Sequence, residues 1–150
     1  MQKDILFSDI VMAGMDLFDA LDKENQEEAD KAQAQLNEYK QKLVIRHYIP
    51  LLEKQQLLIK ILYNIGGEGD AAVSAVSQTA AEIIYGLIEG YTNIENDLMS
   101  TAMDDRIIDM LYNTDFIPLI EEHCFDDYQR LLDMVERTIN WSNFLDVVDT

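Results

Sequence analysis

The stretch that decides the fold is residues 71–99, AAVSAVSQTAAEIIYGLIEGYTNIENDLM. Its apolar residues recur at steps of four, three, four, three and four, at Ala80, Ile84, Leu87, Tyr91, Ile94 and Leu98. A mean step of about 3.5 residues is typical of helices that pack lengthwise against one another. The stretch therefore predicts a long helix with an inward apolar seam, capped at its start by Asp70 after a glycine-rich break.

Two glycines interrupt the second half of this stretch, Gly86 and Gly90. Each costs a helix about 1 kcal/mol relative to alanine, so two of them four residues apart need a reason. A neighbouring helix that passes close to the backbone supplies one. We expect such a crossing there, within the bundle or across a dimer.

Helical spacing continues outward from this stretch, while the chain has only six glycines and two prolines and lacks period-two alternation. The chain has 150 residues, the usual size of one domain. We expect a single all-α domain over residues 1–150, a bundle of about five to seven helices around a long central helix near 71–99. The segment 51–64 has the widest apolar arc and is expected to be the most buried. The other predicted helices cover about 3–21, 26–48, 102–112, a short segment that ends near 123, and 128–141.

Charge is the extreme property of the sequence, with 29 acidic and 11 basic residues and a net charge of −18. Residues 67–150 carry 18 acidic side chains and only three basic ones, whereas residues 43–66 carry a net charge of +2. An acidic surface repels nucleic acids and anionic membranes and attracts basic proteins. The composition therefore argues against direct nucleic-acid or membrane binding.

The sequence also suggests where the protein is found. The longest uncharged run has 11 residues, too few to cross a bilayer, and Asp4 and Asp9 interrupt any apolar signal segment. The single cysteine cannot form an internal disulfide, which suits a reducing compartment. We expect a cytoplasmic protein, located in the host cytoplasm if the gene is viral.

Three patterns in the sequence are candidates for a catalytic or metal-binding site. Glu24-x-x-Glu27 and Glu27-x-x-Asp30 resemble the paired carboxylates with which all-α nucleotide pyrophosphohydrolases bind magnesium, but they lie in the most polar segment of the chain. Cys124 directly follows His123, and helix neighbours point about 100° apart, so the two cannot form a dyad. The glycine-rich turn at 66–69 contains Glu68 and is followed by Asp70 rather than by a lysine. We expect no catalytic residue, no metal and no cofactor.

The clustered carboxylates of the second half remain as the candidate site. We expect a non-enzymatic module that binds a basic protein surface, such as a phage-type inhibitor or nucleic-acid mimic that occupies the basic groove of a nucleic-acid-binding protein. One alternative is an assembly protein (a chaperone, adaptor or virion component) that binds through an apolar face, either the 71–99 seam, which could also join two copies, or the apolar tail at residues 141–148. Another is an all-α metal-dependent nucleotide hydrolase. The expected partner-binding residues are Asp104, Asp105, Asp109, Glu121, Glu122, Asp126 and Asp127.

Overall fold

The computed structural model describes residues 1–66, 72–98 and 103–148, apart from the side chains of 62–66, 72–80, 139 and 141–148. The all-α prediction is confirmed, with six helices and one short pair of strands in this part of the chain. The glycine-rich turn and the Asp70 cap lie outside the described residues. The elements are β1 (Ile5–Leu6), α1 (Phe7–Asp22), α2 (Gln26–Lys42), α3 (Leu51–Gly66), α4 (Ala72–Tyr91), β2 (Ile94–Glu95), α5 (Asp105–Asn113) and α6 (Phe116–Val148).

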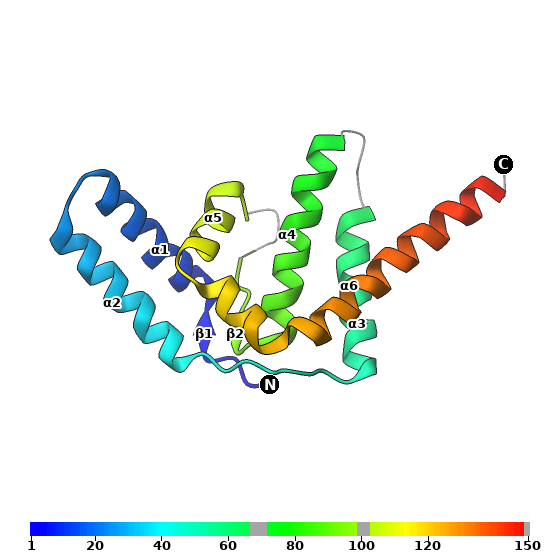
Figure 1. Ribbon diagram of the computed structural model, residues 1–150, viewed down its shortest axis with the longest axis horizontal. Coiled ribbons are helices and arrows are strands. Elements are labelled where there is room, and N and C mark those ends of the chain that lie inside the picture. Colours follow the sequence, from blue (N-terminus) through cyan, green and yellow to red (C-terminus); the bar gives the residue numbers. More distant parts are fainter. Residues whose placement is uncertain (67–71, 99–102, 149–150) are drawn as a thin grey trace.

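Two antiparallel helix pairs, α1 with α2 and α3 with α4, make up most of the molecule (Figure 1). Helix α5 packs against α1, and α6 contacts α5, α4 and α3 in turn as it crosses the molecule. Beyond α3 the last part of α6 extends away from the other helices toward the C-terminus (Figure 1). No helix in the described ranges combines the length and the apolar character that a membrane span requires.

Helix α4 ends at Tyr91, so the predicted long helix is correct at its centre but too long at its C-terminal end. Thr92 ends the helix, since its hydroxyl donates to the Ile88 carbonyl at 2.7 Å and accepts from the Ile94 N–H at 3.2 Å. Short polar side chains compete with helical backbone bonds in this way. The seam residues Ile84, Leu87 and Tyr91 are buried as predicted, whereas Ile94 is buried as part of β2.

Asn93 joins three segments that are distant in sequence. Its side-chain oxygen accepts from the Val44 N–H at 2.8 Å, and its amide group donates to the Lys42 carbonyl at 3.0 Å. The Asn93 carbonyl accepts the Asp4 N–H at 2.8 Å, next to the parallel pairing of β1 with β2. For this reason the first helix begins at Phe7 rather than near residue 3, and the second ends at Lys42 rather than near residue 48.

The prediction that the 51–64 helix is the most buried is wrong. In α3 the side chains of Leu51, Leu52 and Ile59 are 60%, 66% and 67% exposed, while Leu57 and Ile61 are buried. Helix α3 lies at one side of the molecule and packs mainly against α4 and α6, so its wide apolar arc exceeds the surface that these neighbours cover.

The predicted close crossing at Gly86 and Gly90 is present, between α3 and α4 of the same chain. A Cβ atom on Gly86 would lie 2.7 Å from the Ile61 side chain, and one on Gly90 would lie 2.6 Å from the Leu57 side chain. Each glycine thus leaves room for an apolar side chain of the facing helix. Gly14 of α1 accommodates Met110 of α5 in the same manner, at 2.3 Å from a Cβ position.

Candidate functional site

Six of the seven predicted partner-binding carboxylates lie on α5 and the first part of α6 with their side chains exposed or half-buried. Asp104 also caps α5, since its carboxylate accepts from the Ile107 N–H at 3.0 Å. Glu121 is half-buried, and burial raises the pKa of its carboxyl group. We call the set the α5–α6 acidic surface; it consists of Asp104, Asp105, Asp109, Glu121, Glu122 and Asp126.

The carboxylates of the α5–α6 acidic surface take part in no ion pair within the described residues. All lysines and arginines belong to the described part of the chain, and there no basic side chain forms an ion pair with this surface. Arg106, which lies within the cluster in sequence, pairs instead with Asp19 of α1 at 2.8 Å. The six carboxylates therefore carry negative charge that no ion pair within the described chain neutralises.

Asp127, the seventh predicted residue, does not belong to this surface. Its side chain is only 6% exposed and forms a 2.7 Å ion pair with Lys54 of α3. Its second oxygen accepts from the Tyr91 hydroxyl at 2.7 Å and from the Ile49 N–H at 3.1 Å. A carboxylate with three internal donors is not free to bind a partner, so Asp127 is a structural residue and its prediction as a contact is corrected.

The buried network around Asp127 fixes four segments of the chain to one another: the connection before α3, α3 itself, the end of α4, and α6. Lys54 also donates to the Ile49 carbonyl at 2.7 Å. Burial favours a neutral carboxyl group, but the hydrogen bonds from Lys54, Tyr91 and Ile49 outweigh it and lower the pKa of Asp127. Burial, together with the hydrogen bond to Asp127, raises the pKa of the Tyr91 phenol.

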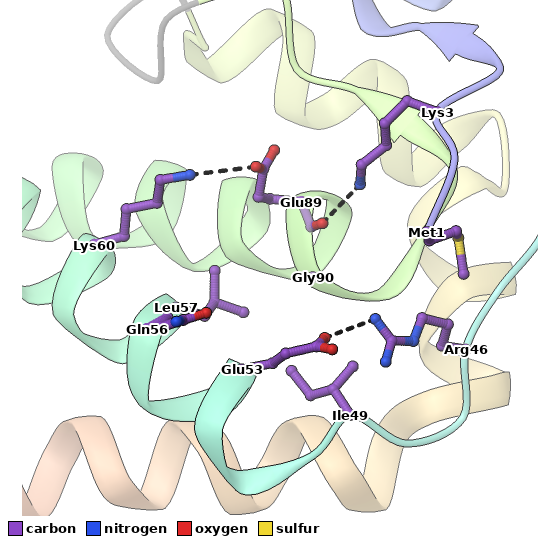
Figure 2. A pocket seen from close by; sticks show the side chains of 10 residues that line it. All are labelled: Met1, Lys3, Arg46, Ile49, Glu53, Gln56, Leu57, Lys60, Glu89 and Gly90. Carbon is purple, nitrogen blue, oxygen red and sulfur yellow. Dashed lines mark hydrogen bonds and ion pairs between the residues drawn. The ribbon is translucent and has the colours of Figure 1, made fainter.

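A cavity of about 450 Å³ lies on the other side of Ile49, between the N-terminal segment, α3 and the end of α4. Figure 2 shows its charged side chains. Lys3 and Lys60 approach Glu89 from opposite sides, and Arg46 reaches toward Glu53 (Figure 2). The Lys60–Glu89 and Arg46–Glu53 ion pairs measure 3.3 and 2.7 Å. The cavity therefore gathers basic side chains in a strongly acidic protein.

The other residues considered for catalysis are not arranged for it. Cys124 is buried and donates to the Ile120 carbonyl at 3.2 Å, and burial, aided by the charge of Asp127, raises the pKa of its thiol to about 12. His123 points to solvent, so the two neighbours diverge as expected. No group of three or more histidine, cysteine, aspartate or glutamate side chains in the described ranges is arranged to hold a metal ion.

Among the described residues, the exposed large apolar side chains do not lie on the 71–99 seam, where a contact between copies was predicted. Ile84, Leu87 and Tyr91 of the 71–99 seam are buried within one chain, so these residues are not available as a contact between copies. Helix α3 carries three exposed apolar side chains, Leu51, Leu52 and Ile59, which we call its exposed apolar face; other large apolar side chains, such as Met12 and Phe125, are exposed elsewhere. The side chains of the apolar segment 141–148 lie outside the described residues.

Comparisons of this chain with protein-family models, with curated proteins and with solved structures found no match. The functional proposal therefore rests on the residues of this chain alone.

Sequence reasoning missed the Lys54–Asp127 pair, although a signal was present. Lys54 precedes the buried Leu57 and Ile61 at helical spacing, and Asp127 lies on the buried stripe of α6, so two opposite charges occupy inward positions on two helices.

Proposed function

We propose that the protein is a non-enzymatic binding module that contacts a basic protein surface through its α5–α6 acidic surface. The observation that carries this proposal is the absence of ion pairs on that surface within the described chain: five of its six carboxylates are exposed, and the one arginine among them in sequence is paired with Asp19. Such a surface speeds the approach of a positively charged partner and rejects acidic ones.

The partner we propose is a nucleic-acid-binding protein whose basic groove receives the acidic helices. Grooves that bind duplex DNA match a charge about every 1.7 Å of helix axis, so they are strongly basic. The dense carboxylates of α5 and α6 supply charges of the same sign. In this proposal the protein acts as an inhibitor that imitates nucleic acid.

An assembly role is the second candidate, and the exposed apolar face of α3 favours it. Leu51, Leu52 and Ile59 present apolar surface that no described residue covers. Docking through such a face buries apolar area, so it depends little on ionic strength. Salt dependence therefore distinguishes the two candidates.

The test is a pull-down from an extract of the source cell with three immobilised proteins. The first is the parent chain, and the second carries Asp104→Asn, Asp105→Asn and Asp109→Asn; asparagine at position 104 still caps a helix. The control removes three exposed carboxylates at the α1–α2 turn, through Asp22→Asn, Glu27→Gln and Asp30→Asn. We expect a basic protein, identified by mass spectrometry, on the parent and control columns only. Equal capture by all three would contradict the proposal.

A further inference from the structure

The cavity in Figure 2 has a mixed lining that differs from the rest of the molecular surface. Ile49, Leu57 and Gly90 contribute apolar wall, and Leu57 is held in place by its contact with Gly90. The charged side chains of the lining are three cations and two carboxylates, which sum to +1 in a chain of net charge −18. A volume of about 450 Å³ lies within the range of small-molecule sites. The charged side chains of the lining belong to Lys3, Arg46, Lys60, Glu53 and Glu89.

The cations of the cavity have donors to spare. An ammonium group has three N–H donors, and Lys3 uses two of them on the Glu89 and Thr92 carbonyls, each at 2.8 Å. A guanidinium has five donors, and among the described residues the side chain of Arg46 donates only to Glu53. Lys60 donates to Glu89 alone within that same part of the chain. Free donors from separate segments therefore face one cavity.

The three cations are also close enough to disturb one another. Burial, together with the positive charges of Arg46 and Lys60, lowers the pKa of Lys3, against the attraction of Glu89. The lowered pKa therefore reflects above all the partial burial of the Lys3 ammonium, which disfavours its charged form. An anion placed beside Lys3 would stabilise that charged form and accept the free donors.

We propose that this cavity binds a small ligand that combines an anionic group, either carboxylate or phosphate, with an apolar portion. The anionic group accepts from Lys3 and Arg46, and the apolar portion packs on Ile49 and Leu57. The site is separate from the α5–α6 acidic surface in residues and in charge, so it can be tested on its own.

The test is a titration followed by backbone amide NMR, with Gly90 as the reporter in the cavity wall. The probes are benzoate and phenyl phosphate as anions, benzyl alcohol as the neutral control, and benzylammonium as the cation. We expect saturable shifts at Gly90 with an anion and a dissociation constant of about 1 mM, as befits a small fragment. The anion with the lower dissociation constant shows whether the site prefers a carboxylate or a phosphate group. Absence of saturation with both anions up to about 10 mM, or equal binding of benzyl alcohol, would overturn the proposal.

Two charge variants then test the site, because removal of a cation and removal of a carboxylate should change the affinity for the anion in opposite directions. Arg46→Gln should weaken anion binding at least about tenfold, the loss expected for a charge-assisted hydrogen bond. Glu53→Gln should strengthen it several-fold, because the net charge of the lining rises. Lys23→Gln and Glu136→Gln make the same charge changes at exposed positions outside the cavity and should leave binding unchanged. If Glu53→Gln weakened binding, the cavity would be a site for a zwitterion or a cation and the proposal would be wrong.

Discussion

Removal of the Asp127 carboxylate should be among the most damaging single changes in the chain. Asp127→Ala would leave the Lys54 ammonium, 8% exposed, without its ion-pair partner at 2.7 Å. Breaking a buried pair from one side costs about 3–5 kcal/mol, because the remaining charge is uncompensated. The Tyr91 hydroxyl and the Ile49 N–H would also lose their shared acceptor. A whole domain of this size is stable by only about 5–15 kcal/mol, so the variant should be close to unfolding.

The assay is urea unfolding followed by far-UV circular dichroism, on Asp127→Ala, Lys54→Met and the double variant. Because Lys54→Met removes the stranded charge, the double variant should be less destabilised than the sum of the single variants, with a coupling of about 1–3 kcal/mol. The exposed pair Glu38–Lys42 is the matched control, and its disruption should change the free energy of unfolding by less than about 0.5 kcal/mol. A loss under about 1 kcal/mol for Asp127→Ala would refute the reasoning.

The same network sets a pH dependence. The pKa of Asp127 is lowered in the folded protein, so its contribution to stability is complete above its unfolded pKa of about 4. The contribution is lost as the pH falls through the lower, folded value. The parent should therefore lose stability below about pH 4 more steeply than the Lys54→Met/Asp127→Ala variant, which lacks this group.

Three further predictions concern packing and the thiol. Leucine at Gly86 or Gly90 should destabilise the protein by about 1–3 kcal/mol by overpacking against Ile61 or Leu57, measured as a lower melting temperature; unchanged melting of both variants would rule out the crossing. Leu87→Ala should cost about 2–5 kcal/mol in urea unfolding, since Leu87 is 1% exposed, and a loss under about 1 kcal/mol would contradict its burial. Cys124 should react with a disulfide reagent far more slowly in the folded protein than in urea, because burial raises the pKa of its thiol to about 12; equal rates would show an accessible thiol.

Features that follow from local spacing could be predicted from the sequence. The apolar seam of α4 and the close approach at its glycines are properties of one helix and its neighbour, and both are present. The end of α4 could not be found this way, because the residues that follow it are bound by segments far away in sequence: Lys3 donates to the Thr92 carbonyl, and the Asn93 side chain bonds to the backbone at Lys42 and Val44. The β1–β2 pairing is two residues long on each strand, too short to leave a pattern.

The predicted burial of α3 is wrong because the apolar content of a helix does not show how many neighbours cover it. Helix α3 is rich in apolar residues, but a helix with neighbours on only part of its circumference leaves some of them exposed, as at Leu52 and Ile59. For the candidate site, the exposure of Asp104, Asp105 and Asp109 could be predicted because helix surfaces favour charge. Asp127 could not be separated from them by charge clustering alone, because its buried partner, Lys54, lies in another helix.

The most direct test of the proposed function is a titration of the captured partner with the parent and with the Asp104→Asn/Asp105→Asn/Asp109→Asn variant, at low and at high salt. If the α5–α6 acidic surface forms the contact, the affinity of the parent falls as salt rises. The variant binds more weakly at low salt and depends less on salt, and duplex DNA competes with the parent for the partner. Equal affinities in all four titrations would contradict the proposal and favour a contact through the apolar face of α3.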